Sequence, residues 1–108
     1  FKIIHCDEFQ TQGTEKIAER IKKRVGNNPL YLSIDIDVLD PAFAPGTGTP
    51  EIAGMTSREM VNVLRGLSGL NLISADVVEV SPAYDHAEVT SLAAATIVYE
   101  LTNLFAKT

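Results

Sequence analysis

Two aspartates separated by one residue, Asp35 and Asp37, are the first feature of this sequence that could carry chemistry. They close an apolar stretch, Leu30 to Ile36, that reads as a strand. Side chains alternate along a strand, so both carboxylates are expected on one face and close together. Like charges at that distance repel unless a cation neutralises them, and hard divalent cations take oxygen ligands. The alternative is a solvated acidic pair, and this spacing alone does not decide between the two.

The segment that follows, Asp37 to Met55, is long and has neither a helical nor a strand pattern. Asp40-Pro41 predicts an abrupt turn, while Gly46 and Gly48 allow backbone conformations closed to other residues. Long irregular segments in compact domains tend to be functional. We therefore expect this loop to lie beside a bound ligand and to offer polar side chains such as Thr49. The alternative is an ordinary surface loop.

A further carboxylate, Glu79, lies near the carboxyl end of a second predicted strand, Asn71 to Val80. Ligands of parallel sheets bind at this edge. A carboxylate there could pair with a planar guanidinium through two parallel hydrogen bonds. The alternative is an acid satisfied by backbone groups or by an arginine. Asp76, three residues earlier, is expected on the opposite face and is interpreted as structural.

The remaining reactive side chains point to no familiar catalytic arrangement. His5 is interpreted as a partly buried histidine beside a short strand, and Cys6 as a small core residue. His86 lies in a predicted loop on the edge that carries Glu79, so a role in a substrate pocket is a hypothesis for it. One cysteine excludes an intramolecular disulfide framework.

The elements alternate between strand and helix, which predicts an α/β fold with a parallel sheet and helices on both faces. Thr56 to Glu59 forms a capping-box pattern that opens a helix, and Asp85 to Glu88 forms a second one. The expected order is a strand at 2–5, a helix at 14–25, a strand at 30–36, a helix from 56 to about 66, a strand at 71–80 and a final helix from 85 through 104.

Bulk properties place the chain among ordinary globular proteins. It has 108 residues and a net charge of −5, with no strong basic patch, so nucleic acid and anionic membranes are poor candidate partners. No apolar run approaches the roughly 20 residues of a membrane span. The sequence opens with Phe1 directly into a strand, so we expect residues 1–108 to be one part of a larger single domain.

These residues resemble a known family. Residues 33–41 read Ser-Ile-Asp-Ile-Asp-Val-Leu-Asp-Pro and residues 45–51 read Pro-Gly-Thr-Gly-Thr-Pro-Glu, which is similar to a signature of the ureohydrolases, the arginases and agmatinases. Together with residues 76–88, the match looks closest to agmatinases. It covers essentially the whole chain, but only about the carboxy-terminal third of such an enzyme.

The resemblance implies a manganese-dependent enzyme of arginase-like fold that hydrolyses a guanidino compound, most simply agmatine, to urea and putrescine. Asp35 would bridge two Mn²⁺ ions and Asp37 would bind one of them. Glu79 would pair with the guanidinium group, Thr49 would line the same pocket, and the neighbouring His86 is included as a candidate. Guanidinobutyrate or another guanidino acid is the alternative substrate.

The resemblance also sets limits on this chain. The family's other metal ligands, two histidines and two aspartates, come from upstream segments, so a non-catalytic fragment or truncated homologue is the competing hypothesis. Ile52-Ala53-Gly54 stands where the family has a glycine pair, which restricts the loop. A small-molecule substrate, a homo-oligomer (trimer or hexamer) and a cytoplasmic location are expected, with mitochondrial and secreted locations as alternatives.

Overall fold

A computed structural model describes residues 1–107 of the chain. The elements in chain order are α1 (Asp7–Gln12), α2 (Thr14–Val25), β1 (Leu30–Asp35), η1 (Ile36–Val38), α3 (Ser57–Gly66), β2 (Leu72–Val78), η2 (Pro82–Tyr84) and α4 (Val89–Ala106). The α/β class is confirmed, and so are five of the expected elements, which became α2, β1, α3, β2 and, with a later start, α4.

The strands β1 and β2 pair in parallel, with α3 as the crossover between them. Leu32 faces Ala75, Ile34 faces Val77, and Asp35 faces Val78 in this register. Ile34 is buried, whereas Tyr31 and Ser33, which alternate with it, are exposed. The sheet therefore has one face in the core and one open face within residues 1–107.

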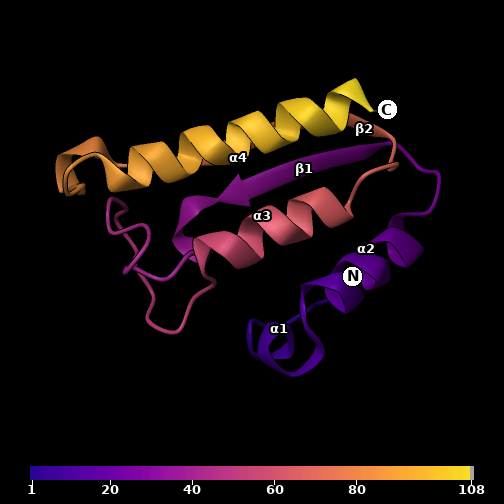
Figure 1. Cartoon of the computed structure of the whole chain (residues 1–108), viewed down its shortest axis with the longest axis horizontal. Coiled ribbons are helices and arrows are strands. Elements are labelled where there is room, and N and C mark those ends of the chain that lie inside the picture. Colours follow the sequence, from indigo (N-terminus) through magenta and orange to yellow (C-terminus); the bar gives the residue numbers. More distant parts are fainter. Residues whose placement is uncertain (108) are drawn as a thin grey trace.

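The covered face packs against α3 and α4, which run alongside the strands in Figure 1. The buried side chains that join these elements form one cluster: Ala18, Ile34, Ile36, Leu39, Ala44, Met55, Met60, Val63, Leu64, Leu67, Leu70, Leu72, Ile97, Leu101 and Leu104. This cluster fixes α3 and α4 against the sheet, and with them the loops that leave the carboxyl ends of both strands.

The helix α3 begins with the predicted capping box. Thr56 Oγ1 accepts from the Glu59 N–H at 3.0 Å, and the Glu59 carboxylate accepts from the Thr56 N–H at 2.8 Å. Near its end, α3 approaches α2 closely, because a Cβ on Gly66 would lie 2.6 Å from the Ala18 Cβ. The glycine permits this contact between the two helices.

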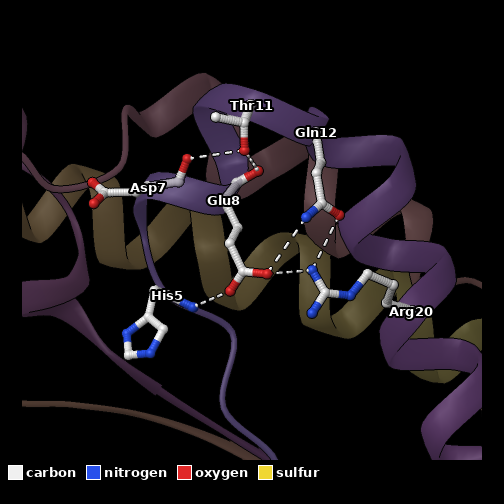
Figure 2. Close-up of polar contacts among 6 residues, drawn as sticks. All are labelled: His5, Asp7, Glu8, Thr11, Gln12 and Arg20. Carbon is white, nitrogen blue, oxygen red and sulfur yellow. Dashed lines mark hydrogen bonds and ion pairs between the residues drawn. The ribbon is translucent and has the colours of Figure 1, made fainter.

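The predicted strand at Lys2–His5 is wrong. Among residues 1–107 no strand pairs with this segment, and its backbone instead enters α1. The His5 N–H donates to Glu8 Oε2 at 2.7 Å, and Glu8 Oε1 pairs with Arg20 at 2.7 Å (Figure 2). The His5 N–H and C=O, which a strand would give to a neighbour, are thus both used locally, by the carboxylate and the N–H of Glu8. His5 itself is exposed, not partly buried as expected.

The start of α4 also differs from the expectation. The helix begins at Val89, and the two residues before it, Ala87 and Glu88, have left-handed φ values of 48° and 61°. The Glu88 side chain makes no capping hydrogen bond to the helix. The second capping box is therefore wrong. Asp85 acts from further upstream, accepting hydrogen bonds from the backbone N–H groups of Thr90 and Ser91.

The helix α4 carries apolar side chains both on its covered side and on its exposed side. Ile97 and Leu101 are buried, whereas Leu92 and Val98 are 65% and 50% exposed. By length and composition alone α4 could also cross a membrane, contrary to the expectation that no segment is long enough. Its packing on β2 and α3 is that of a core helix with a second, uncovered apolar side.

Candidate active site

Asp35 and Asp37 lie together where β1 ends, but not through simple strand alternation. The strand stops at Asp35 and the 3₁₀ turn η1 follows, so the Asp37 N–H folds back and donates to Asp35 Oδ1 at 3.1 Å. Burial raises the pKa of the Asp35 carboxyl; the Asp37 N–H lowers it, and the Asp37 carboxylate raises it further. The two acids are thus close enough to repel, as the sequence predicted.

Thr49 lies against this pair. Its Oγ1 donates to Asp37 Oδ2 at 2.8 Å, which ties the middle of the loop to the end of β1. Thr49 is exposed on its other side. The hydroxyl therefore orients the Asp37 carboxylate and remains open to solvent at the same edge.

Glu79 lies at the same edge on the neighbouring strand. The last residue of β2, Val78, pairs with Asp35, the last residue of β1. Glu79 is the next residue after Val78, so it leaves the sheet at the same level as Asp37 and its neighbours leave β1. It is exposed and has a φ of 67°, a left-handed conformation that is uncommon for a residue with a side chain. Conformations of this kind cluster at functional sites. We call Asp35, Asp37, Thr49 and Glu79 the strand-end site.

The loop is closed at its base by backbone pairing. Met55 donates to Val38 O at 2.9 Å, and Asp40 donates to Met55 O at 2.8 Å. Gly54 fits into this junction, since a Cβ there would lie 2.5 Å from the Asp40 nitrogen. The preceding Ala53 adopts a φ of 69° and donates its N–H to Asp40 Oδ2 at 3.0 Å. Where the resemblance expects a glycine, an alanine thus holds a glycine-type conformation.

The loop is also docked onto the second strand's loop and onto α4. Gly46 accepts from the Ser81 N–H at 2.7 Å and donates to Thr90 Oγ1 at 2.7 Å. A Cβ at Gly46 would lie 2.8 Å from the Asp85 Cβ. These contacts link the segments that carry Thr49 and Glu79, so the two arms of the site are held relative to one another.

His86 is exposed, and its contacts in the structure are through the backbone, to Asp85 Oδ1 and from Val89. Its ring is not brought into the strand-end site by any contact that the structure shows. Its role in substrate binding stays a prediction, as do the binding roles of the other four residues.

The donor set fits part of a metal site. Asp35 and Asp37 provide adjacent carboxylates, and hard divalent cations favour such ligands. Within residues 1–107, however, no group of three or more His, Cys, Asp or Glu side chains is placed to hold a metal ion. Asp35 and Asp37 therefore fit part of a metal site, and further ligands would be needed to complete one.

One cluster near the site was missed by sequence reasoning. Ser33 Oγ donates to Asp76 Oδ1 at 2.6 Å, and the Tyr31 hydroxyl donates to Asp76 Oδ2. The pairing of Ser33 with Asp76 depends on the strand register, and the register shifts between Leu30 and Tyr31. Alternation of side chains within each strand gave no information about that shift.

Comparison with known proteins supplies the family. The sequence matches the Arginase family over residues 1–103. The chain belongs to the arginase family. It is 58% identical over 108 residues to a putative agmatinase of Schizosaccharomyces pombe, covering all of this chain and 27% of that protein. It is 52% identical over 106 residues to a guanidinopropionase of Pseudomonas aeruginosa, covering 98% of this chain and 33% of that protein.

Solved structures of similar proteins have the same fold as this arginase-family chain. The crystal structure of a hypothetical agmatinase from Burkholderia thailandensis superposes with a TM-score of 0.95 at 48% identity, over 97% of this chain and 33% of that one. The arginase-like fold is thereby confirmed. The chain spans about a quarter to a third of the length of these relatives, as the resemblance implied.

Proposed function

We propose that the full-length protein carrying this arginase-family chain is a ureohydrolase that uses Mn²⁺ to hydrolyse agmatine to putrescine and urea. The observation that supports it most directly is the convergence of Asp35, Asp37 and Glu79 at one edge of a parallel sheet. Relatives named agmatinase, 58% and 48% identical to this chain, support the choice of substrate.

In this proposal different residues of the chain bind the metal, orient a metal ligand and bind the substrate. Asp35 and Asp37 would hold Mn²⁺ with ligands outside residues 1–108, and the bound metal would supply an activated water. Thr49 keeps the Asp37 carboxylate oriented through its hydroxyl. Glu79 would bind the substrate guanidinium through two parallel hydrogen bonds and present its carbon to the metal side of the site.

A guanidino acid is the alternative substrate, since one relative is named a guanidinopropionase. A guanidino acid such as guanidinobutyrate carries the same guanidinium group with a carboxylate tail. Glu79 recognises only the shared end of these molecules.

A second candidate is a non-catalytic chain. The observation that favours it is that residues 1–107 bring together no group of three metal-binding side chains. Under this hypothesis the 108-residue chain folds and associates with copies of itself but binds Mn²⁺ weakly and turns nothing over. It applies to the chain by itself, whereas the enzyme proposal applies to the full-length protein.

Urea release from agmatine by the Mn²⁺-loaded full-length protein tests the first proposal. Asp37→Ala is expected to abolish turnover because it removes a metal ligand, while Asp7→Ala, at an exposed position of α1, is expected to leave it unchanged. Guanidinobutyrate is assayed in parallel. Full activity of Asp37→Ala would overturn the assignment, and urea release by the 108 residues alone would exclude the non-catalytic hypothesis.

A further inference from the structure

Three side chains on the open face of the sheet form a closed hydrogen-bonded cluster. Ser33 Oγ donates to Asp76 Oδ1 at 2.6 Å, and the Tyr31 hydroxyl donates to Asp76 Oδ2. Ser33 lies directly opposite Asp76, whereas Tyr31 pairs with Ser74 and reaches diagonally along the sheet. Both oxygens of one carboxylate on β2 are thus bound by hydroxyls from β1. We call these three residues the hydroxyl clamp.

The clamp lies immediately behind the strand-end site. Asp35 is two residues beyond Ser33 on β1, so the two share a face of the strand. Glu79 is three residues beyond Asp76, one past the end of β2. The clamp therefore joins the two strands two residues before Asp35 on β1 and three residues before Glu79 on β2.

The charges in the clamp suit a firm link. The hydroxyls of Ser33 and Tyr31 lower the pKa of Asp76, while the Asp76 carboxylate raises the pKa of Tyr31. At neutral pH Asp76 is therefore an ionised acceptor and Tyr31 a protonated donor. Hydrogen bonds to an ionised acceptor are roughly twice as strong as neutral ones. In the described part of the chain no lysine or arginine pairs with Asp76.

Glu79 requires such a link more than an ordinary residue would. Its φ of 67° is a strained conformation that persists only where the surrounding structure holds the backbone in place. Val78, the residue before Glu79, is the last residue of β2 that pairs with β1, and the Glu79 side chain is exposed. Asp76 anchors the strand three residues before the chain turns, on the side that faces β1.

We propose that Asp76 is a positioning residue, which through the hydroxyls of Tyr31 and Ser33 holds Glu79 at a fixed separation from Asp35 and Asp37. The inference rests on the proposed function, because Glu79 is the guanidinium-binding group there. Asp76 touches neither substrate nor metal. It acts by fixing where β2 ends relative to β1.

Steady-state kinetics of the Mn²⁺-loaded full-length protein with agmatine test this role. Asp76→Asn, Ser33→Ala and Tyr31→Phe each remove a bond of the clamp, and Asp76→Asn is expected to raise KM roughly tenfold with a smaller change in kcat. Ser33→Thr keeps the hydroxyl and is expected to keep the wild-type KM. Ser74→Ala, which removes an exposed hydroxyl from β2, the strand that carries Asp76, is the matched control.

A KM unchanged in all three clamp variants, or raised equally by Ser74→Ala, would overturn the proposal. If Asp76→Asn fails to fold, the KM of Tyr31→Phe decides the test. This variant removes only one oxygen from an exposed ring, so it is expected to fold. Absence of urea release by the wild-type protein would instead count against the proposed function.

A spectroscopic readout on the full-length protein, which does not depend on turnover, separates these two failures. The backbone chemical shifts of Glu79 are expected to carry the left-handed signature in the wild type and in Ser33→Thr, and to lose it in Asp76→Asn. Glu79 shifts that are identical in Asp76→Asn and the wild type would overturn the positioning role, whatever the enzyme assay gives.

Discussion

At the scale of single residues, Asp85 shows how one carboxylate can organise a turn. Its Oδ1 accepts from the N–H groups of His86 and Thr90, and its Oδ2 accepts from the Ser91 N–H at 3.1 Å. The Thr90 and Ser91 N–H groups belong to the first turn of α4, where backbone N–H groups have no partner within the helix. The same side chain lies where a Cβ at Gly46 would clash, so it also fixes the approach of the site loop.

This arrangement predicts a specific loss of stability in acid. Burial raises the pKa of Asp85, but the hydrogen bonds from Thr90, Ser91 and His86 outweigh it and lower the pKa from 3.8 to about 2. A depressed pKa contributes stability above the unfolded value that is lost as the pH falls toward the folded value. Relative to Asp85→Asn, wild type is expected to lose its advantage in unfolding free energy between about pH 4 and pH 2.

Urea denaturation across this pH range measures the effect. Glu51→Gln, at an exposed loop position, is the control and is expected to track the wild type at every pH. An Asp85→Asn curve that runs parallel to the wild-type curve from pH 6 to pH 2 would contradict the linkage.

Site residues were predictable to the extent that chemistry depends on sequence spacing. Asp35, Asp37 and Glu79 could be assigned to one edge because strands of a parallel sheet end together. Their detailed geometry could not, since η1 replaces the expected strand alternation at Asp37. The clamp on Asp76 was missed for a related reason: which residue faces which across two strands depends on register, and a shift at the start of β1 sets it here.

At the scale of elements, the contact of α2 with α3 depends on the absence of one methyl group. A Cβ at Gly66 would lie 2.6 Å from the Ala18 Cβ, and Ala18 is 2% exposed. Alanine favours a helix over glycine by about 1 kcal/mol. Despite that gain, Gly66→Ala is expected to lower the free energy of unfolding by roughly 1–3 kcal/mol, because the overpacked helices must move apart.

A double-mutant cycle isolates this contact. Ala18→Gly combined with Gly66→Ala moves the methyl group from α2 to α3, so the double variant is expected to lose at least about 1 kcal/mol less than the sum of the single variants. Gly48→Ala, where a Cβ would meet nothing within 4 Å, is the neutral control. Additive losses in the cycle would show that the two helices can separate freely.

Elements with their own local signals were predicted well, and those that depend on distant partners were not. The Thr56 capping box and the spacing of apolar residues located α3 and α2. Lys2–His5 is apolar enough for a strand, but strands need a hydrogen-bonded neighbour, and none lies beside it within residues 1–107. The segment instead leads into the short helix α1 (Asp7–Gln12), which an ion pair between Glu8 and Arg20 ties to α2 (Figure 2).

At the scale of the whole molecule, the described chain leaves much apolar and strand-edge surface uncovered. The sheet has two strands, and two-stranded sheets are marginal unless other elements pack on them. Each strand has an unpaired edge within residues 1–107, and Tyr31 is 56% exposed on the open face. Along α4, Leu92, Val98 and Tyr99 are at least half exposed. Relatives three to four times as long contain further chain that could cover such surfaces.

The 108-residue chain, produced by itself, is therefore expected to self-associate. Exposed apolar surface and open strand edges both favour contacts between copies. Sedimentation velocity over a wide range of concentrations should show a weight-average mass that rises with concentration, and Leu92→Lys with Val98→Lys should reduce that rise. Ile52→Lys replaces an apolar residue that is 79% exposed but belongs to the loop and not to α4, and it is expected to leave association unchanged. A chain that stays monomeric throughout, or that responds equally to Ile52→Lys, would show that α4 is not the surface through which copies meet.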